Sequence, residues 1–446
     1  MSRSGTRTEA GVGVVIAAAV AGTWLAAGGA LSARDTAAAQ ARPAAPGAAA
    51  ATQAWPTWRG PVSTGEAPAA KPLVEWSETK NVRWKVPIPG RGKSSPIVWR
   101  DTVYLTTAIP GDGGRQKFTL VAVNRATGAV TWTRTLHEEV PHEGTHPDGS
   151  YAAGSALTDG ERLYAWFGSR GLYAVDFSGT VLWEKQLGKM ETRMGFGEGS
   201  SVALHQGTLF VPWDHEGADA VIAIDGATGR EKWRTPRDEP TTWATPLVVA
   251  DGATRQVVLS GTNRVVGYDL ASGKVLWQAG GTTANAIPTP VYGDGVLIAM
   301  GGFRGSMARA IRLADAKGDV TGAPAQLWTY EKDTPYVPSP LYYRGSVYFL
   351  KVNSGILTKL DARTGAVKFS ERLAAVPNVY ASPVAADGRI YVLGREGTTV
   401  VLADDAAAPK VLATNVLDDA TDSTPALVDG EIYLRGAKSL YRLSAN

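Results

Sequence analysis

One segment of the chain concentrates the side chains that most often bind metals. Between residues 137 and 148 stand three histidines and four carboxylates: His137, Glu138, Glu139, His142, Glu143, His146 and Asp148. Imidazole and carboxylate groups together can hold a divalent ion. A solvated polar loop has the same composition, so we interpret the segment as a loop and predict no metal site.

Two other patterns imitate known binding motifs. Asp418, Asp419 and Asp422 offer oxygen ligands suited to calcium, but no D-x-[DN]-x-[DN]-G loop surrounds them and turn capping explains them equally well. Residues 90–94 (GRGKS) resemble the end of a phosphate-binding loop, yet Pro87 stands where its first glycine is needed. A G-x-S-x-G nucleophile motif is also missing. Catalytic residues therefore stay unassigned.

A repeated unit must position these side chains. It consists of an S/T-P step, a D-G turn and a D-x-x-[ST]-G turn followed by tryptophan. The units start roughly 45 residues apart, and a period of about 20–50 residues is typical of solenoids and propellers. Four short β segments fit each unit, which makes it a propeller blade. The starts are Ser95-Pro96, Thr245-Pro246, Thr289-Pro290, Ser339-Pro340, Ser382-Pro383 and Thr424-Pro425, with degenerate copies at Gly154-Ser155 and Ser200-Ser201.

Eight units predict an all-β fold, an eight-bladed β-propeller of four-stranded antiparallel blades. The last unit, from Thr424, has room for only three strands, while residues 82–86 read as a fourth strand without a unit of their own. We expect this N-terminal strand to join the last blade and close the ring, which removes an open sheet edge. The tryptophans are expected to cover the seams between blades: Trp84, Trp132, Trp183, Trp233, Trp277 and Trp328.

The first 41 residues read as an export signal. Arg3 and Arg7 precede an apolar run over residues 12–31, and small residues follow at 37–41. Because the run approaches the roughly 20 residues that span a bilayer, an uncleaved anchor is the alternative. We expect a periplasmic or secreted protein, with membrane contact only through this segment. The predicted organisation is residues 1–41 signal peptide or anchor, 42–54 Ala/Pro-rich linker, 55–81 N-terminal extension and 82–446 propeller.

Composition excludes several classes of function. The 446 residues carry a net charge of +3, with 45 Lys and Arg interspersed among 42 Asp and Glu, so no basic stripe is offered to nucleic acid. Cysteine is absent, which excludes disulfides, a thiol nucleophile and thiolate metal ligands.

Strand parity indicates where function resides. In an up-and-down blade, the loop between strands two and three lies on the same rim as the connection to the next blade, and this rim receives the long polar loops. Arg, Asn, Trp and Tyr in such loops favour planar hydrogen bonds and stacking over plain solvation. We expect a small-molecule ligand or a protein partner there. The candidate residues are Arg170, His215, Glu216, Asp238, Trp243, Asn263, Arg264, Asn285, Arg304, Asp333, Tyr336, Asn353, Asn378, Arg395, Glu396 and Asp422.

The D-x-x-T-G-x-x-x-W motif, clearest at residues 225–233, resembles the pyrroloquinoline-quinone (PQQ) repeat superfamily. The resemblance covers about 84 to 446, and the opening residues 55–61 (WPTWRGP) look like the leader of exported bacterial members. That superfamily includes quinoprotein alcohol and glucose dehydrogenases and a scaffold lipoprotein of outer-membrane barrel assembly. It therefore implies the propeller fold, with more than one function.

The enzyme members imply PQQ stacked on an aromatic ring at the ring centre, with Ca²⁺ held by Glu, Asn and Asp side chains. Trp243, Arg304, Asn263, Asp333 and Glu216 have the required types. The vicinal cysteine pair, the haem motif and the lipid-attachment cysteine of particular members are absent. We favour a rim that binds a ligand, such as a sugar, or a protein partner, without assigned catalysis. A PQQ/Ca²⁺-dependent dehydrogenase and an assembly scaffold are the alternatives.

Overall fold

The structure is a computed structural model that describes residues 54–404 and 407–445. The expected export signal, residues 1–41, and the expected linker up to residue 53 lie outside the described residues. Within the described ranges, no helix is both long and apolar enough to span a membrane.

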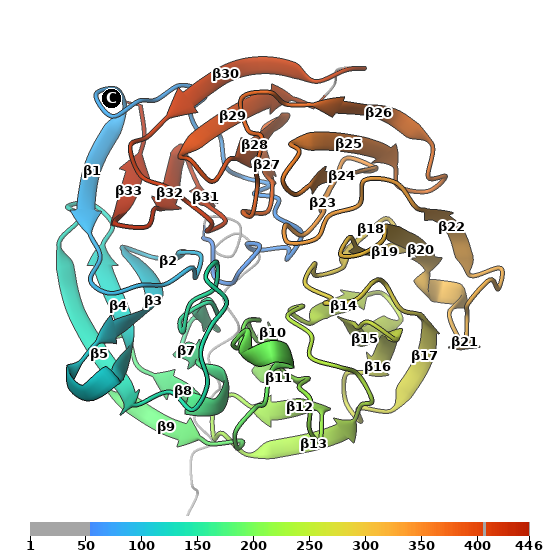
Figure 1. Cartoon of the computed structure of the whole chain (residues 1–446), viewed down its shortest axis with the longest axis horizontal. Helices are drawn as coiled ribbons and strands as arrows, with labels where there is room; N and C mark the ends of the chain where they lie inside the picture. The colour runs from blue at the N-terminus through green and yellow to red at the C-terminus, as the bar shows by residue number, and fades with distance from the viewer. Residues whose placement is uncertain (1–53, 405–406, 446) are drawn as a thin grey trace, which may run out of the picture. The chain divides into compact units, whose positions relative to one another are not determined.

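Eight antiparallel sheets stand around a central axis as the blades of a propeller (Figure 1). This confirms the predicted fold class and the predicted number of blades. The first strand of each blade lies nearest the axis and the last lies outermost (Figure 1).

The first four blades follow the chain from residue 97. Their strands are, for blade 1, β2 (Ile97–Trp99), β3 (Thr102–Pro110), β4 (Gln116–Asn124) and β5 (Val130–Glu139); for blade 2, β6 (Leu157–Thr158), β7 (Leu163–Trp166), β8 (Leu172–Val175) and β9 (Val181–Lys185); for blade 3, β10 (Ala203–His205), β11 (Thr208–Trp213), β12 (Ala220–Asp225) and β13 (Glu231–Pro236); for blade 4, β14 (Leu247–Asp251), β15 (Thr254–Ser260), β16 (Arg264–Asp269) and β17 (Val275–Gly280).

The other four blades complete the ring. Their strands are, for blade 5, β18 (Val291–Gly293), β19 (Val296–Gly301), β20 (Met307–Arg312) and β22 (Gln326–Tyr330); for blade 6, β23 (Leu341–Tyr343), β24 (Ser346–Lys351), β25 (Ile356–Asp361) and β26 (Val367–Arg372); for blade 7, β27 (Val384–Ala386), β28 (Arg389–Leu393), β29 (Thr398–Ala403) and β30 (Lys410–Val416); for blade 8, β31 (Ala426–Val428), β32 (Glu431–Arg435), β33 (Ser439–Leu443) and β1 (Val82–Pro87).

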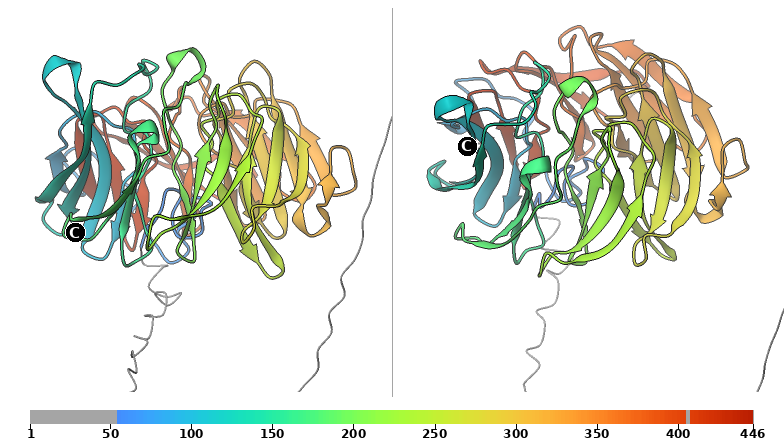
Figure 2. Two further views of the ribbon diagram at one scale, coloured as in Figure 1. Left: turned by 90° about the horizontal axis from the view of Figure 1, so that it is seen from below. Right: turned by 60° about the horizontal axis from the view of Figure 1, so that its bottom comes forward.

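Short elements decorate the connections. They are the 3-10 turns η1 (Asp112–Gly114), η2 (Gly168–Arg170), η3 (Arg193–Gly195) and η4 (Leu313–Asp315), and the strand β21 (Gly318–Asp319). The loops that carry η1 and η3 rise on one side of the ring (Figure 2).

The ring closes through its N-terminal strand, as predicted. β1 pairs antiparallel with β33, with Lys85 opposite Tyr441 and Val86 opposite Leu440. Val82, Trp84 and Val86 turn their partly buried side chains toward the core of the last blade. The last blade thus gains the fourth strand that its own sequence lacks.

Tryptophans join neighbouring blades through the glycine turns. The indole N–H of Trp183 in blade 2 donates to the carbonyl of Gly226 in blade 3 at 2.9 Å. Gly229 has φ +71°, and a Cβ there would lie 2.9 Å from the Trp183 ring. The motif therefore needs glycine both for its backbone conformation and for the ring that covers it. The same indole bond joins Trp84, Trp132, Trp233 and Trp328 to Arg125, Phe177, Leu270 and Ala362.

Trp277 meets a different partner, because blade 5 carries an insertion where the glycine turn stands in other blades. The indole of Trp277 donates to Gln256 Oε1 of its own blade at 2.5 Å. The insertion folds back so that β21 pairs parallel with β17. Trp277 is buried and packs with side chains of blade 5, including Leu297 and Ile311, so its predicted place at a seam is confirmed.

Gly229→Ala is expected to lower the free energy of unfolding by about 2 kcal/mol or more, because a side chain at positive φ is strained and must also displace the Trp183 ring. Gly252→Ala is the matched control: Gly252 has φ +54° but nothing within 4 Å of its Cβ position, so only about 1 kcal/mol of backbone strain remains. Chemical denaturation measures both. Equal losses would contradict the proposed role of the tryptophan.

Seven of the eight repeat starts supply a hydroxyl that joins two blades at the centre of the ring. Ser155 Oγ accepts the backbone N–H of Ser95 at 2.9 Å, and Ser201 Oγ accepts that of Ser155 at 2.9 Å. The relay continues around the ring at 2.9–3.0 Å through Thr245, Thr289, Ser339 and Ser382, and reaches Thr424 at 3.1 Å. The repeated hydroxyl is thus part of the scaffold.

The N-terminal extension crosses the middle of the ring, away from the side where the long loops rise (Figure 1 and Figure 2). Trp55 forms a β-bridge with Val98, and Glu66 forms one with Ala385. The Arg59 guanidinium is buried and donates to three carbonyl oxygens, among them that of Pro383 at 3.0 Å. Burial lowers the pKa of Arg59 to about 9.

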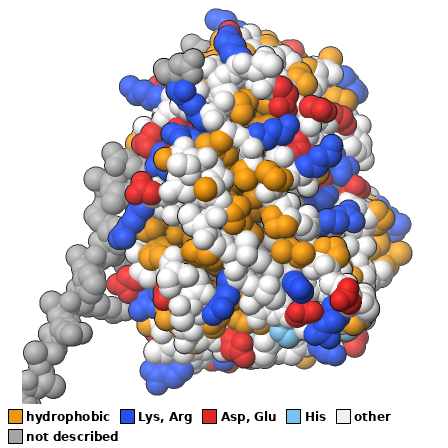
Figure 3. All heavy atoms as spheres, turned by 90° about the vertical axis from the view of Figure 1, so that its left-hand side faces the viewer, with side chains coloured by type: hydrophobic (Ala, Val, Ile, Leu, Met, Phe, Trp, Pro, Cys, Tyr) orange, Lys and Arg blue, Asp and Glu red, His pale blue; other side chains and the backbone are white. Residues whose placement is uncertain are grey.

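On the side of the ring that carries β1 and β5, acidic and basic side chains are mixed with hydrophobic ones (Figure 3). No patch of a single sign dominates this face, as expected from the interspersed charges of the sequence.

Candidate functional site

A cavity of about 470 Å³ lies at the centre of the ring. The connections that lead from the last strand of one blade to the first strand of the next supply most of its wall. Six of the seven residues that supply relay hydroxyls contribute to the lining. Its large rings are Trp58, Phe196, Trp243, Phe303, Tyr336 and Tyr380.

Neighbouring groups fix two of these rings. The Trp243 indole donates to the carbonyl of Gly197 at 2.8 Å, and its edge lies where Gly199 leaves room. Tyr336 stacks on Phe303, with 4.7 Å between ring centroids and 26° between the planes. The cavity therefore has aromatic walls that are set before any ligand arrives.

One side of the cavity is polar and is organised by Arg395. This guanidinium donates to Asp422 at 2.8 Å and to Asp148 at 2.7 Å, and it stacks 3.8 Å over the Tyr380 ring. Lys93 forms a second ion pair with Asp422. Asp148 lies on the connection between blades 1 and 2, so it reaches across to blade 7.

The network changes the acidity of its members. The hydrogen bond from Arg395 holds the pKa of Asp148 below its usual range. Burial, with the Asp148 charge nearby, raises the pKa of Tyr380 to about 12. At neutral pH Tyr380 is thus a neutral donor to Asp148, at 3.2 Å, and Asp148 is an anion.

A second cavity of about 420 Å³ adjoins the first. Lys93, Gly149, Ser150 and Asp422 line both. The second cavity is otherwise bounded by polar residues and backbone, including Arg91, Asn378, Arg395 and Glu396.

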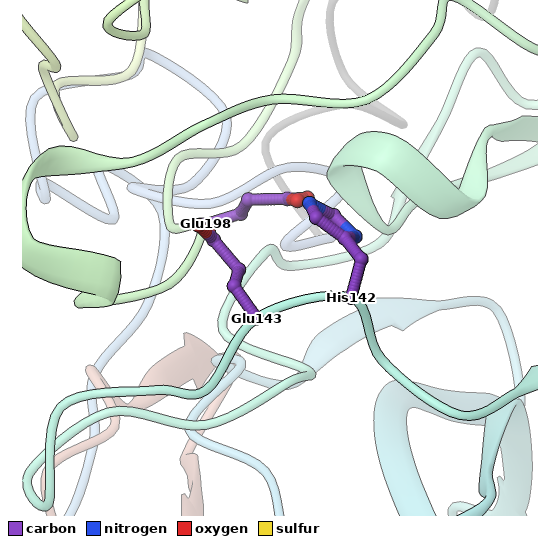
Figure 4. A group of neighbouring side chains, drawn as sticks. All are labelled: His142, Glu143 and Glu198. Atoms are coloured by element: carbon purple, nitrogen blue, oxygen red, sulfur yellow. The ribbon is translucent and has the colours of Figure 1, made fainter.

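His142, Glu143 and Glu198 come together near the first cavity, with ligand atoms within 4.8 Å of one another (Figure 4). Arg170 already supplies a cation here: it donates to Glu198 at 2.8 Å and lies 3.2 Å from His142 Nδ1. Glu143 accepts hydrogen bonds from Thr192, and burial raises the pKa of Glu198. These contacts anchor the long connection after β5 to its neighbour, and we assign no metal to the group.

The sequence matches the family model described as "Outer membrane protein assembly factor BamB" over residues 62–195, 178–322 and 253–446. The chain belongs to this family. No curated protein sequence matches it.

Solved structures share the propeller at low sequence identity. BamB from Moraxella catarrhalis is 12% identical with a TM-score of 0.55, over 81% of this chain and 99% of that one. Quinohemoprotein alcohol dehydrogenase from Comamonas testosteroni is 12% identical with a TM-score of 0.62, over 89% and 81% of the two chains. The computationally designed Ika8 protein is 12% identical with a TM-score of 0.53, over 80% and 98%. At this identity the likeness shows the fold alone.

The residues expected for a quinone and calcium do not converge. Trp243 lines the aromatic cavity. Glu216 instead accepts hydrogen bonds from Thr241, Asp333 pairs with Lys351, and the backbone N–H of Asn263 donates to Glu239. These three residues make separate contacts on different loops, so they do not form the calcium set that the resemblance implied.

The structure distributes the predicted rim residues among several places. Trp243, Tyr336 and Asp422 line the first cavity, and Asn378, Arg395, Glu396 and Asp422 line the second. Asn285 is buried behind the first cavity, 3.4 Å from the Tyr336 hydroxyl, with its Oδ1 unpartnered among the described residues.

The remaining candidates lie outside both cavities. Arg170 is buried under Glu198, and His215 is buried against Trp213. Asp238, Asn263 and Arg264 form one exposed group, in which both neighbours donate to the Asp238 carbonyl. Arg304 lies over Phe303, 5.3 Å from its ring centroid, and the backbone N–H of Asn353 donates to Asn378.

Sequence reasoning missed several lining residues, among them Trp58, Lys93, Phe196 and Glu198. Phe196 and Glu198 precede the degenerate start at Ser200-Ser201, so the parity argument could have found them. Lys93 belongs to the GRGKS segment that was set aside. The sequence around Trp58 does not indicate that this residue lines the cavity, because Trp58 belongs to the N-terminal extension and not to a repeat unit.

Proposed function

We propose that this protein is an exported receptor that holds a small, flat, mainly apolar ligand in the aromatic cavity at the ring centre. The observation that carries the proposal is the cavity itself. Its volume of about 470 Å³ lies within the usual range of small-molecule sites, and aromatic rings with a few polar groups are the usual lining of such sites.

The aromatic walls of the cavity are already held in position, which supports binding without rearrangement. Trp243 and the Tyr336–Phe303 stack are held by their own contacts, so the ligand does not have to immobilise them. The Arg395 network provides polar groups on one side only, which would orient a ligand. No reaction is assigned, because the carboxylates of that network are already paired with cations.

Export rests on the sequence of residues 1–41. A positive lead, an apolar run and small residues are the features of a secretory signal. We place the receptor in the periplasm or outside the cell, either free or held by this segment.

Trp243→Ala is expected to weaken binding of the neutral, flat fluorescent probe N-phenyl-1-naphthylamine at least tenfold, because the variant removes a ring wall worth about 1.4 kcal/mol or more. Fluorescence titration of the folded protein measures the dissociation constant. Trp243→Phe keeps an aromatic wall and should retain most of the affinity.

Leu182→Ala is the control for adventitious adsorption. Leu182 is an exposed apolar residue on the outer strand β9, so its loss should leave the titration unchanged. Absence of saturable binding, or equal binding by the Trp243→Ala variant, would rule out the receptor proposal.

A protein partner is the second candidate. The matched family model is described as an assembly factor of outer membrane proteins, and Met194 at η3 presents an 80% exposed apolar side chain on a rim connection. A scaffold of this kind needs no affinity in the central cavity, so the probe titration separates the two candidates.

A further inference from the structure

The second cavity has a charge arrangement that the aromatic cavity does not share. Lys93 and Arg395 are neutralised by Asp422, and Arg395 also by Asp148. Arg91 lines the cavity with an exposed side chain that makes no ion pair among the described residues. Glu396 is exposed and also lines this cavity, and it likewise makes no ion pair among the described residues.

A further cation lies directly behind the cavity wall. Arg435 on β32 is 3% exposed and donates to Ser94 Oγ at 2.6 Å and to the Thr106 carbonyl at 2.7 Å. No carboxylate pairs with it in the described part of the chain. A Cβ on the lining residue Gly92 would lie 2.5 Å from Arg435 Nη2, so the guanidinium packs directly against a residue of the cavity wall.

Burial lowers the pKa of Arg435 to about 9, which still leaves it protonated at neutral pH. Buried charges are normally paired, because an unpaired ion in the interior loses its hydration. When Asp148 is counted with the lining carboxylates Asp422 and Glu396, the four cations Arg91, Lys93, Arg395 and Arg435 leave an excess of one positive charge at the second cavity.

A polar group without a partner marks the junction of the two cavities. Ser150 is 8% exposed, it lines both cavities, and its Oγ has no hydrogen-bond partner among the described residues. A buried hydroxyl without a partner costs free energy that a bound acceptor would recover.

We propose that the second cavity binds a carboxylate group carried by the ligand whose apolar part occupies the aromatic cavity. Arg435 supplies the positive charge in excess, Arg91 adds a guanidinium that makes no ion pair among the described residues, and the Ser150 hydroxyl donates to the carboxylate where the cavities meet. This inference rests on the proposed receptor function and narrows its ligand to an aromatic or otherwise flat acid.

Matched ligands test the charge. We expect 2-naphthylacetate to bind at least tenfold more tightly than its neutral amide, 2-naphthylacetamide, in calorimetric titrations of the folded protein. Arg91→Gln should lower the affinity for the acid at least threefold and leave that for the amide unchanged. Arg134→Gln is the control, because Arg134 is an exposed arginine on the outer strand β5 and is not among the residues that line either cavity.

Ser150→Ala tests the unpartnered hydroxyl separately. The affinity for 2-naphthylacetate should fall about 3- to 10-fold, as expected for loss of one hydrogen bond to a charged group. The midpoint of thermal unfolding should stay unchanged or rise, since the variant removes a buried polar atom that has no partner in the free protein. A residue with a merely structural role would show the opposite pattern.

The outcomes separate the two proposals. If neither naphthyl compound binds, the receptor function itself fails. If the amide binds but the acid gains nothing over it, or if Arg91→Gln and Arg134→Gln have equal effects, the carboxylate site is wrong while the receptor remains. An unchanged affinity of the Ser150→Ala variant for the acid removes Ser150 from the site.

Discussion

Asp214→Asn is expected to destabilise the protein by about 3 kcal/mol or more, since it leaves a buried arginine without its counter-charge. Arg237 donates to the two Asp214 oxygens at 2.7 and 3.1 Å, and the two side chains are 1% and 0% exposed. Thr242 and Tyr268 complete the cluster, at 2.7 Å from Asp214 and 2.8 Å from Arg237. Burial opposes the charged form of Arg237, but the Asp214 charge outweighs it and raises the pKa of Arg237, so both partners are charged in the native protein.

The free energy of unfolding, measured by chemical denaturation, checks this expectation. Asp238→Asn makes the same chemical change on the same rim, but the Asp238 side chain is 97% exposed, so its effect should stay within about 0.5 kcal/mol. If the two variants unfold at the same denaturant concentration, the buried pair does not have the stabilising role given to it here.

The fold could be predicted because its determinants are local and repeated. Asp225 accepts hydrogen bonds from the Thr228 backbone and hydroxyl, so the glycine turn is encoded within four residues. The tryptophan that covers a turn belongs to the neighbouring blade, and its spacing repeats with the blades. Ring closure could also be predicted locally, since residues 82–86 repeat the fourth-strand pattern around Trp84.

The site could be predicted only to the level of the rim. Parity places Asp238 and Asp422 on the same rim, but the path of each connection decides that Asp422 reaches both cavities while Asp238 points to solvent. Contacts between distant blades decide the rest. Asp148 meets Arg395 across the ring, and Trp58 arrives from the extension, neither of which a repeat period encodes.

Residue type alone also misleads about role. Arg170, His215 and Glu216 have the chemistry of a binding site, yet their hydrogen bonds hold loops in place. A charged side chain on a rim loop is free for a ligand only if its neighbours leave it unpaired. That condition depends on packing between connections, and nothing in the sequence of the GRGKS segment indicates that Arg91 makes no ion pair among the described residues.

A variant that begins at residue 89 should lose the closed ring, whereas one that begins at residue 82 should keep it. The two differ only by residues 82–88, which comprise β1 and Ile88, because both lack the extension that crosses the ring. Without β1, the backbone of β33 becomes an open edge, and the seam loses the indole bond of Trp84 to the Arg125 carbonyl. Loss of a packed tryptophan costs about 3–5 kcal/mol, and the unpaired strand adds to that cost.

We therefore expect the shorter variant to associate with itself in sedimentation velocity and to unfold at a lower denaturant concentration than the longer one. Adding a synthetic peptide of residues 80–88 should reverse both effects, because an open edge accepts a strand in trans. Lys85→Ala in the longer variant is the control, since its exposed side chain leaves the backbone pairing with Tyr441 intact. A shorter variant that stays monomeric with unchanged unfolding would show that the seam between blades 8 and 1 holds without its fourth strand, and that closure by β1 is dispensable.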